Sequence, residues 1–166
     1  GYLGAGGIAD IIATDFGHAG LKIQAVATRD MARTNAFADK FNIPNRHPDY
    51  AALVADPEVD VIYISTVQTL HRDHALLAIE AGKHVYCEWP LALSSIDADE
   101  MAAAAKARGV QHLVGLQGRA APWVLYLKEL LSGGYVGRVL TAHASLFMPD
   151  YRRTPLMANT ARKERG

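Results

Sequence analysis

The chain has 166 residues, of which 50% are hydrophobic and 20% are charged, a composition typical of soluble globular proteins. Seventeen Lys and Arg balance seventeen Asp and Glu, so net charge gives no reason to expect binding to nucleic acid or to a membrane surface. The single cysteine, Cys87, excludes an internal disulfide, and no apolar run reaches the ~20 residues that cross a bilayer. These features favour a reducing, cytoplasmic location.

Strand-like and helix-like segments alternate along most of the chain. Short apolar runs predict strands at residues 22–28, 59–65, 84–87 and 111–116. Helical periodicity with capping and stop signals predicts helices at residues 31–41, 49–55, 71–81 and 94–109. Strands separated by helices of this length form right-handed βαβ units. The predicted fold class is therefore α/β, a Rossmann doubly wound parallel sheet.

The pattern changes near Pro122. Residues 122–131 are predicted to form a helix that starts with this proline, and residues 139–147 are predicted to form a strand. We expect a dinucleotide-binding domain at residues 1–120 and the start of an α/β substrate and oligomerisation domain at residues 121–166. Only three residues precede the first glycine turn, and the late strand has no partner after it, so we expect the chain to be a fragment of a longer protein.

A glycine-rich segment near the start predicts a phosphate-binding turn. Gly4, Gly6 and Ala9 match the form GxGxxA. In that motif the first glycine permits a tight turn, the second allows the backbone to approach a diphosphate, and the small third residue lets the helix pack closely. The N–H groups of the helix start, around Gly7 and Ile8, would face the anion. The motif alone is weak, but a strand ends some twenty residues later, where the ribose is read.

The end of that next strand carries the sequence Thr28-Arg29-Asp30. A hydroxyl and a guanidinium suit a 2′-phosphate, so the prediction is NAD(P) binding with NADP preferred over NAD. The alternative is that Arg29 is solvated and Asp30 accepts hydrogen bonds from the ribose hydroxyls of NAD.

Residues 66–90 read TVQTLHRDHALLAIEAGKHVYCEWP. This segment resembles the Gfo/Idh/MocA oxidoreductase family, whose pattern is TPNxxH, then AGKHV, then EKP. The resemblance implies hydride transfer between a nicotinamide cofactor and a sugar or polyol. It also implies that Thr66 and Gln68 line the cofactor, that His71 lies near the nicotinamide ribose, and that Glu88 holds the cofactor side of the site.

Trp89 occupies the position of the family's catalytic lysine and is counted here with the cofactor-lining residues. An indole N–H donates a hydrogen bond but does not exchange a proton near neutral pH, so the catalytic residues stay unassigned. The segments around Trp89 and Trp123 are similar to those of the galactose/lactose metabolism regulatory proteins. The alternative function is therefore a dinucleotide-binding regulator without catalysis that acts through a protein partner.

Other candidates are weaker. Arg119 follows the last predicted strand of the sheet, where it would contact cofactor or substrate or form a surface salt bridge. His71 and His74 have no third ligand at suitable spacing, so no metal site is predicted. The basic residues after position 150 are expected to be a solvated loop. The expected partners are a sugar-like small molecule and a second copy of the chain that pairs through the later domain, with no nucleic acid or membrane.

Overall fold

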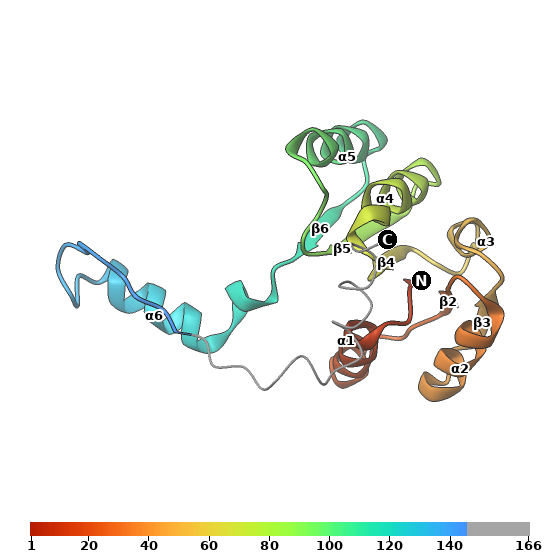
Figure 1. The fold of residues 1–166 in the computed structure, drawn as a ribbon, viewed down its shortest axis with the longest axis horizontal. Helices are drawn as coiled ribbons and strands as arrows, with labels where there is room; N and C mark the ends of the chain where they lie inside the picture. Colours follow the sequence, from red (N-terminus) through yellow and green to blue (C-terminus); the bar gives the residue numbers. More distant parts are fainter. Residues whose placement is uncertain (146–166) are drawn as a thin grey trace, which may run out of the picture. The chain divides into compact units, whose positions relative to one another are not determined.

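The computed structural model describes residues 1–145 (Figure 1). Six strands form one sheet in the order β3-β2-β1-β4-β5-β6, and every neighbouring pair is parallel. The strands are β1 (Tyr2–Leu3), β2 (Ala25–Ala27), β3 (Asn45–His47), β4 (Val61–Ile64), β5 (His84–Glu88) and β6 (His112–Gly115). The chain adds strands towards one edge of the sheet from β1 to β3 and towards the other edge from β4 to β6. Ligands of such sheets bind at the carboxyl ends of the strands, at the point between β1 and β4 where this order reverses.

Within residues 1–145, six α-helices and two short 3-10 helices accompany the strands. The helices are α1 (Gly7–His18), α2 (Met31–Phe41), α3 (Tyr50–Val54), α4 (His71–Glu80), α5 (Ser95–Arg108) and α6 (Pro122–Ser132), with η1 (Gln68–Leu70) and η2 (Gln117–Ala120). Side chains cap three helix starts. The carboxylate of Asp30 accepts from the Arg33 N–H at 2.8 Å, that of Asp49 from the Ala52 N–H at 2.7 Å, and the hydroxyl of Ser94 from the Asp97 N–H at 3.1 Å.

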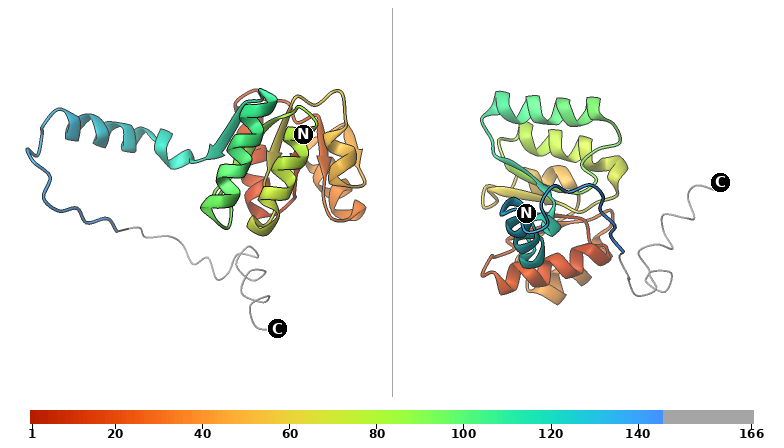
Figure 2. Two further views of the ribbon diagram at one scale, coloured as in Figure 1. Left: turned by 90° about the horizontal axis from the view of Figure 1, so that it is seen from above. Right: turned by 90° about the vertical axis from the view of Figure 1, so that its left-hand side faces the viewer.

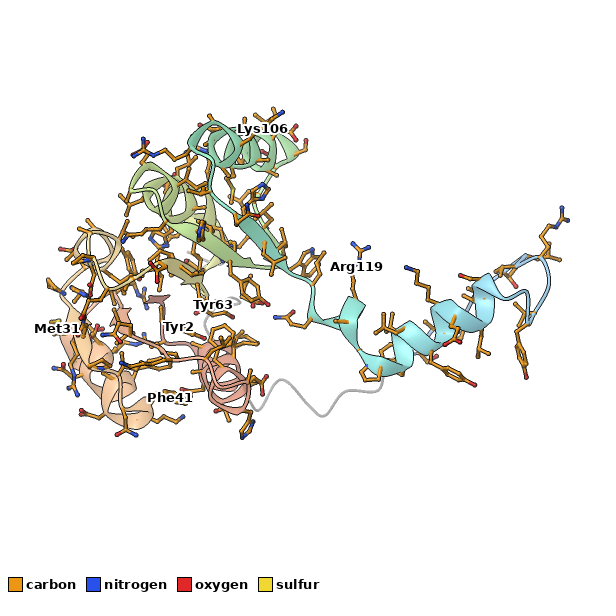
Figure 3. The ribbon with its side chains drawn as sticks, turned by 180° about the vertical axis from the view of Figure 1, so that it is seen from behind. Tyr2, Met31, Phe41, Tyr63, Lys106 and Arg119 are labelled. Atoms are coloured by element: carbon orange, nitrogen blue, oxygen red, sulfur yellow. The ribbon has the colours of Figure 1, made fainter. Side chains whose placement is uncertain are left out.

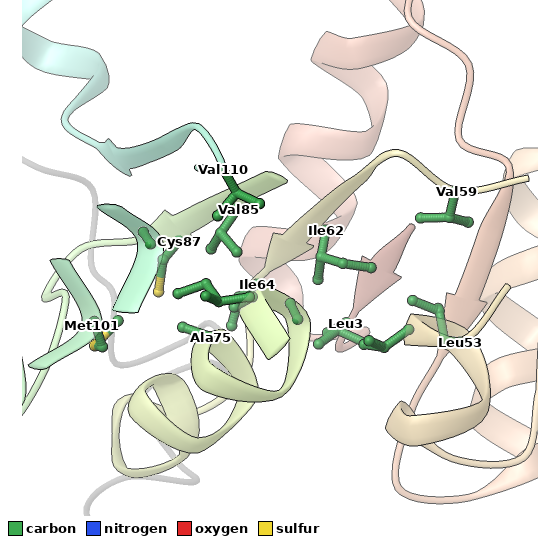
Figure 4. Close-up of a cluster of buried hydrophobic side chains, with 14 of the residues drawn as sticks. Leu3, Leu53, Val59, Ile62, Ile64, Ala75, Val85, Cys87, Met101 and Val110 are labelled. Carbon is green, nitrogen blue, oxygen red and sulfur yellow. The ribbon is translucent and has the colours of Figure 1, made fainter. Parts of the chain in front are cut away.

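Helices cover both faces of the sheet, as Figure 2 shows. On one face α3, α4 and α5 pack through a cluster that includes Leu53, Ala75 and Met101 (Figure 4). On the other face α1 and α2 pack on Tyr2 and Tyr63, whose ring centroids are 4.5 Å apart (Figure 3). The predicted doubly wound parallel sheet is confirmed.

Two predictions about elements need correction. Residues 139–145, the described part of the strand predicted at 139–147, form no strand, and the last two residues of that prediction lie outside the described residues. A strand needs a hydrogen-bonded neighbour, and the described chain offers it none. Conversely, β3 was expected only as a turn near Pro48, because Asn45, Arg46 and His47 are polar and give no apolar signal.

The described chain divides into two units, of which the first is Gly1–Gly115 and the second begins at Leu116. The first unit contains the whole six-stranded sheet. No helix among the described residues has the length and hydropathy needed to cross a membrane.

Candidate functional site: the carboxyl edge of the sheet

The turn after β1 requires glycine at Gly4. Its φ of +104° lies in the region that L side chains rarely adopt, and a Cβ there would lie 3.0 Å from the carbonyl oxygen of Ser65. The Gly4 N–H donates to the carbonyl oxygen of Ala27 at 3.1 Å. The turn is therefore held between the ends of β2 and β4, at the point where the strand order reverses.

Gly6 precedes the first residue of α1, and neither a positive φ nor a close protein neighbour requires glycine at this position. A Cβ added to Gly6 would meet nothing within 4 Å, so the position opens onto free space. The first N–H groups of α1, which starts at Gly7, have no partner within the helix and favour an anion. Ile8 is partly exposed, whereas Ala9 is fully buried and its carbonyl accepts from the Tyr2 hydroxyl at 2.9 Å. This arrangement fits a diphosphate at the start of α1.

Thr28, at the end of β2, is held by hydrogen bonds to its neighbours along the chain. Its side chain is buried, and its hydroxyl donates to the carbonyl oxygen of Asp30 at 2.8 Å. Its N–H donates to the hydroxyl of Thr34 at 3.1 Å. Thr28 therefore shapes the turn into α2. Asp30 is likewise used as the cap of α2.

Two arginines lie at this corner of the sheet edge. Arg29 is exposed, and Arg33 in the first turn of α2 donates from Nη2 to the carbonyl oxygen of Ala5 at 3.3 Å. Burial raises the pKa of Tyr50, and the charges of Arg29 and Arg33 oppose that shift, so both guanidiniums are close to one side chain. Sequence reasoning missed Arg33, although its spacing of four residues from Arg29 was a usable signal.

The residues predicted after β4 tie two loops together. The hydroxyl of Thr66 is 3.0 Å from Nδ1 of His74, and Gln68 donates from Nε2 to the carbonyl oxygen of Ala92 at 2.8 Å. His71 is 2% exposed. Its Nδ1 is 2.9 Å from the carbonyl oxygen of Pro90, and its Nε2 is 3.0 Å from that of Thr66. Both ring nitrogens are thus within hydrogen-bond distance of backbone carbonyl oxygens, and His71 connects the loop after β4 to the loop after β5.

Glu88, the last residue of β5, is fixed from two sides. Its Oε1 accepts from the Tyr63 hydroxyl at 2.6 Å. A Cβ on Gly115 would lie 2.8 Å from the same oxygen, so glycine in β6 leaves room for the carboxylate. Burial, and after it the bond to Glu88, raise the pKa of Tyr63. Tyr63 therefore keeps its proton and remains a donor to Glu88.

Trp89 follows directly and is 65% exposed. Burial raises the pKa of Cys87, two residues before Trp89, to about 12, which excludes a thiolate nucleophile at neutral pH. Arg119 lies in η2, which belongs to the second unit (Figure 3). Among the described residues, no group of three or more His, Cys, Asp or Glu side chains is arranged to hold a metal ion.

Comparison with known proteins agrees with this geometry. Residues 1–116 match the Gfo/Idh/MocA family, described as an oxidoreductase family with an NAD-binding Rossmann fold. Trans-1,2-dihydrobenzene-1,2-diol dehydrogenase of Mus musculus is 38% identical over 123 residues, which cover 74% of this chain and 37% of that protein. The chain therefore spans less than half the length of the curated relatives it matches.

Two solved structures have a similar fold. An NAD-binding oxidoreductase from Klebsiella pneumoniae is 34% identical with a TM-score of 0.76, over 82% of this chain and 39% of that one. A levoglucosan dehydrogenase in complex with NADH and levoglucosan is 26% identical with the same TM-score, over 84% of this chain and 40% of that one. The family match covers most of the chain, and the glycine turn stands where a dinucleotide-binding sheet requires it. The chain thus belongs to the Gfo/Idh/MocA family of NAD-binding oxidoreductases.

Proposed function

We propose that the protein is an NAD(P)-dependent oxidoreductase that acts on the CH–OH group of a sugar, a polyol or a vicinal diol. The observation that carries the proposal is the glycine turn at the carboxyl edge of the sheet. Gly4 has a positive φ that L side chains rarely adopt, and a Cβ on Gly6 would meet no protein atom within 4 Å. The names of the relatives, a diol dehydrogenase and a levoglucosan dehydrogenase, indicate the substrate class.

Different residues of the chain bind the diphosphate and position the loops around the reacting end of the cofactor. When bound, the nicotinamide accepts or supplies the hydride. The start of α1 holds the diphosphate through free N–H groups, and buried Ala9 keeps that helix close to the sheet. Thr66, Gln68 and Glu88 fix the loops around the reacting end. Trp89 offers an apolar ring face and transfers no proton, so the acid–base group must come from another part of the enzyme.

Turnover by the full-length protein tests this proposal against its alternative. NADP and a panel of sugars, polyols and trans-diols are mixed with the protein, and absorbance of the reduced nicotinamide is followed. We expect reduction with at least one substrate. If NADP binds and no alcohol or carbonyl compound is turned over, the regulator hypothesis takes its place. The diol dehydrogenase and the levoglucosan dehydrogenase are enzymes by name and give that hypothesis no support.

We further propose that NADP is preferred, because Arg29 and Arg33 put two positive charges at the end of β2. Each charge-assisted bond to a 2′-phosphate contributes about 1.5–3 kcal/mol, or roughly tenfold or more in affinity. Calorimetry should show that Arg29→Asp and Arg33→Gln each weaken NADP at least about tenfold more than NAD. Arg108→Gln at the end of α5 is the control. Equal losses for both nucleotides would refute the preference.

The remaining proposals concern the whole protein. We propose a cytoplasmic location, in keeping with the single buried thiol. We also propose a homo-oligomer formed through the later domain, which sedimentation velocity of the full-length protein would detect.

A further inference from the structure

Glu88 ends β5, the middle strand of the half-sheet formed by β4, β5 and β6. A doubly wound sheet consists of two mononucleotide-binding halves, and a dinucleotide lies across the carboxyl ends of both. Arg29 and Arg33, assigned above to the 2′-phosphate, follow β2 in the other half. In the proposed function, the half that contains Glu88 therefore receives the nicotinamide end of the cofactor.

The carboxylate of Glu88 is oriented from the core of the sheet. The hydroxyl of Tyr63, in β4, donates to Oε1 of Glu88 at 2.6 Å. Tyr63 is 3% exposed (Figure 3). Its ring packs against three other aromatic rings at centroid distances of 4.5, 5.2 and 5.1 Å, those of Tyr2, Phe16 and Tyr86. A ring packed in this way holds its hydroxyl in one place, so the bond sets the direction of the Glu88 side chain.

The neighbouring strand adds a second constraint. Gly115 of β6 is paired with Glu88 in the parallel register, and a Cβ on Gly115 would lie 2.8 Å from Oε1 of Glu88. A larger residue would displace the carboxylate, because the carboxylate is the movable end of its side chain. The donor in β4 and the glycine in β6 therefore hold one negative charge in one place at the carboxyl edge of the sheet.

We propose that Tyr63 is a positioning residue that fixes the Glu88 carboxylate beside the nicotinamide ring, and that this fixed charge favours the oxidised cofactor. The ring carries a positive charge in NADP⁺ and none in NADPH, so a nearby carboxylate attracts the first form more strongly than the second. The proposal rests on the proposed function, because it requires a bound dinucleotide. It adds a preference for the form that accepts hydride from an alcohol.

Competitive binding to the full-length protein tests the proposal without turnover. Fluorescence of bound NADPH gives its dissociation constant, and displacement by NADP⁺ gives that of the oxidised form. The diphosphate and the 2′-phosphate are common to both nucleotides and cancel in the ratio of the two constants. We expect Glu88→Gln to shift this ratio against NADP⁺ about tenfold. Tyr63→Phe keeps the charge but removes its fixed orientation, and should shift the ratio in the same direction about threefold.

A double variant separates positioning from a general loss of structure. In the Glu88→Gln background no charge is left to orient, so adding Tyr63→Phe should leave the ratio unchanged. Tyr86→Phe is the matched control, because it removes a hydroxyl from the same aromatic cluster and keeps the ring. It should retain the wild-type ratio. If Tyr63→Phe left the ratio unchanged, or shifted it equally in both backgrounds, the positioning role would be refuted.

Gly115→Ala gives an independent test that decides the question even if Tyr63→Phe does not fold. Its Cβ displaces the carboxylate while Tyr63 and the charge remain, so the ratio should again shift against NADP⁺. An unchanged ratio in Gly115→Ala would overturn the proposal. If the wild-type protein binds neither NADP⁺ nor NADPH, the proposed function fails and this inference fails with it. If it binds both and Glu88→Gln does not change the ratio, the inference alone fails.

Discussion

At the scale of single residues, two glycines of one turn are required for opposite reasons. Gly4→Ala forces a side chain into a positive φ and against Ser65, so we expect loss of fold stability by about 1–3 kcal/mol together with loss of binding. Gly6→Ala meets no protein atom. It should leave the melting temperature within about 2 °C of the wild type and still weaken NADP binding at least tenfold, because its Cβ occupies the diphosphate's approach.

Gly17→Ala, in the last turn of α1, is the matched control. A Cβ there also meets nothing within 4 Å, but it lies at the opposite end of α1 from the turn. Differential scanning calorimetry and NADP titration of the three variants separate folding from binding. If Gly6→Ala bound NADP like Gly17→Ala, the diphosphate would not rest on this turn.

The same scale shows which site residues sequence can and cannot assign. The glycine spacing predicted the turn, because backbone geometry depends on residue type directly. Thr28 is predicted to face the cofactor, and the structure adds that Thr34, six residues later, shares its hydrogen bonds. Arg33 looked like an ordinary helix residue until folding brought it to Ala5. Whether a polar side chain faces a ligand or the backbone depends on neighbours that spacing alone does not reveal.

At the scale of elements, helices were predicted well because caps and apolar spacing are local. The short polar strand β3 gave no such signal, since it is held by its surroundings. Asp56, after α3, accepts from Nδ2 of Asn45 at 2.8 Å and lies 2.8 Å from Nε2 of His47. These two side chains belong to β3, and the Glu58 N–H also donates to Asp56. The residue pattern of β3 thus reflects a contact that becomes visible only in the folded chain.

This contact predicts a pH dependence of stability. The bonds from Asn45, from the Glu58 N–H and from His47 lower the pKa of Asp56 from 3.8 to about 2. The stabilisation is therefore fully present above pH 3.8 and is lost as the pH falls through about 2. Asp56→Asn should lower the free energy of unfolding at pH 7 by about 2 kcal/mol through this linkage.

Urea unfolding at pH 7, 4 and 2 measures the effect. The difference between wild type and Asp56→Asn should shrink towards zero at pH 2. Asp39→Asn is the control, because it breaks an exposed ion pair to Arg46 of β3. It should lower the free energy of unfolding by less than about 1 kcal/mol. A difference that stays constant across the three pH values would show that Asp56 is not held as a carboxylate.

At the scale of the whole molecule, the first unit has everything a dinucleotide-binding fold requires. Helices pack on both faces of its sheet through two buried hydrophobic clusters. Every predicted cofactor residue except Arg119 belongs to this first unit. We therefore expect a chain cut after Gly115 to unfold cooperatively and to retain NADP binding. Saturation at 100 times the dissociation constant should stabilise it by about 2.7 kcal/mol, which raises the melting temperature by several degrees. Thermal unfolding with and without NADP measures this. A shortened chain that melts without cooperativity, or that ignores NADP while the 166-residue chain responds, would mean that residues after Gly115 complete the site.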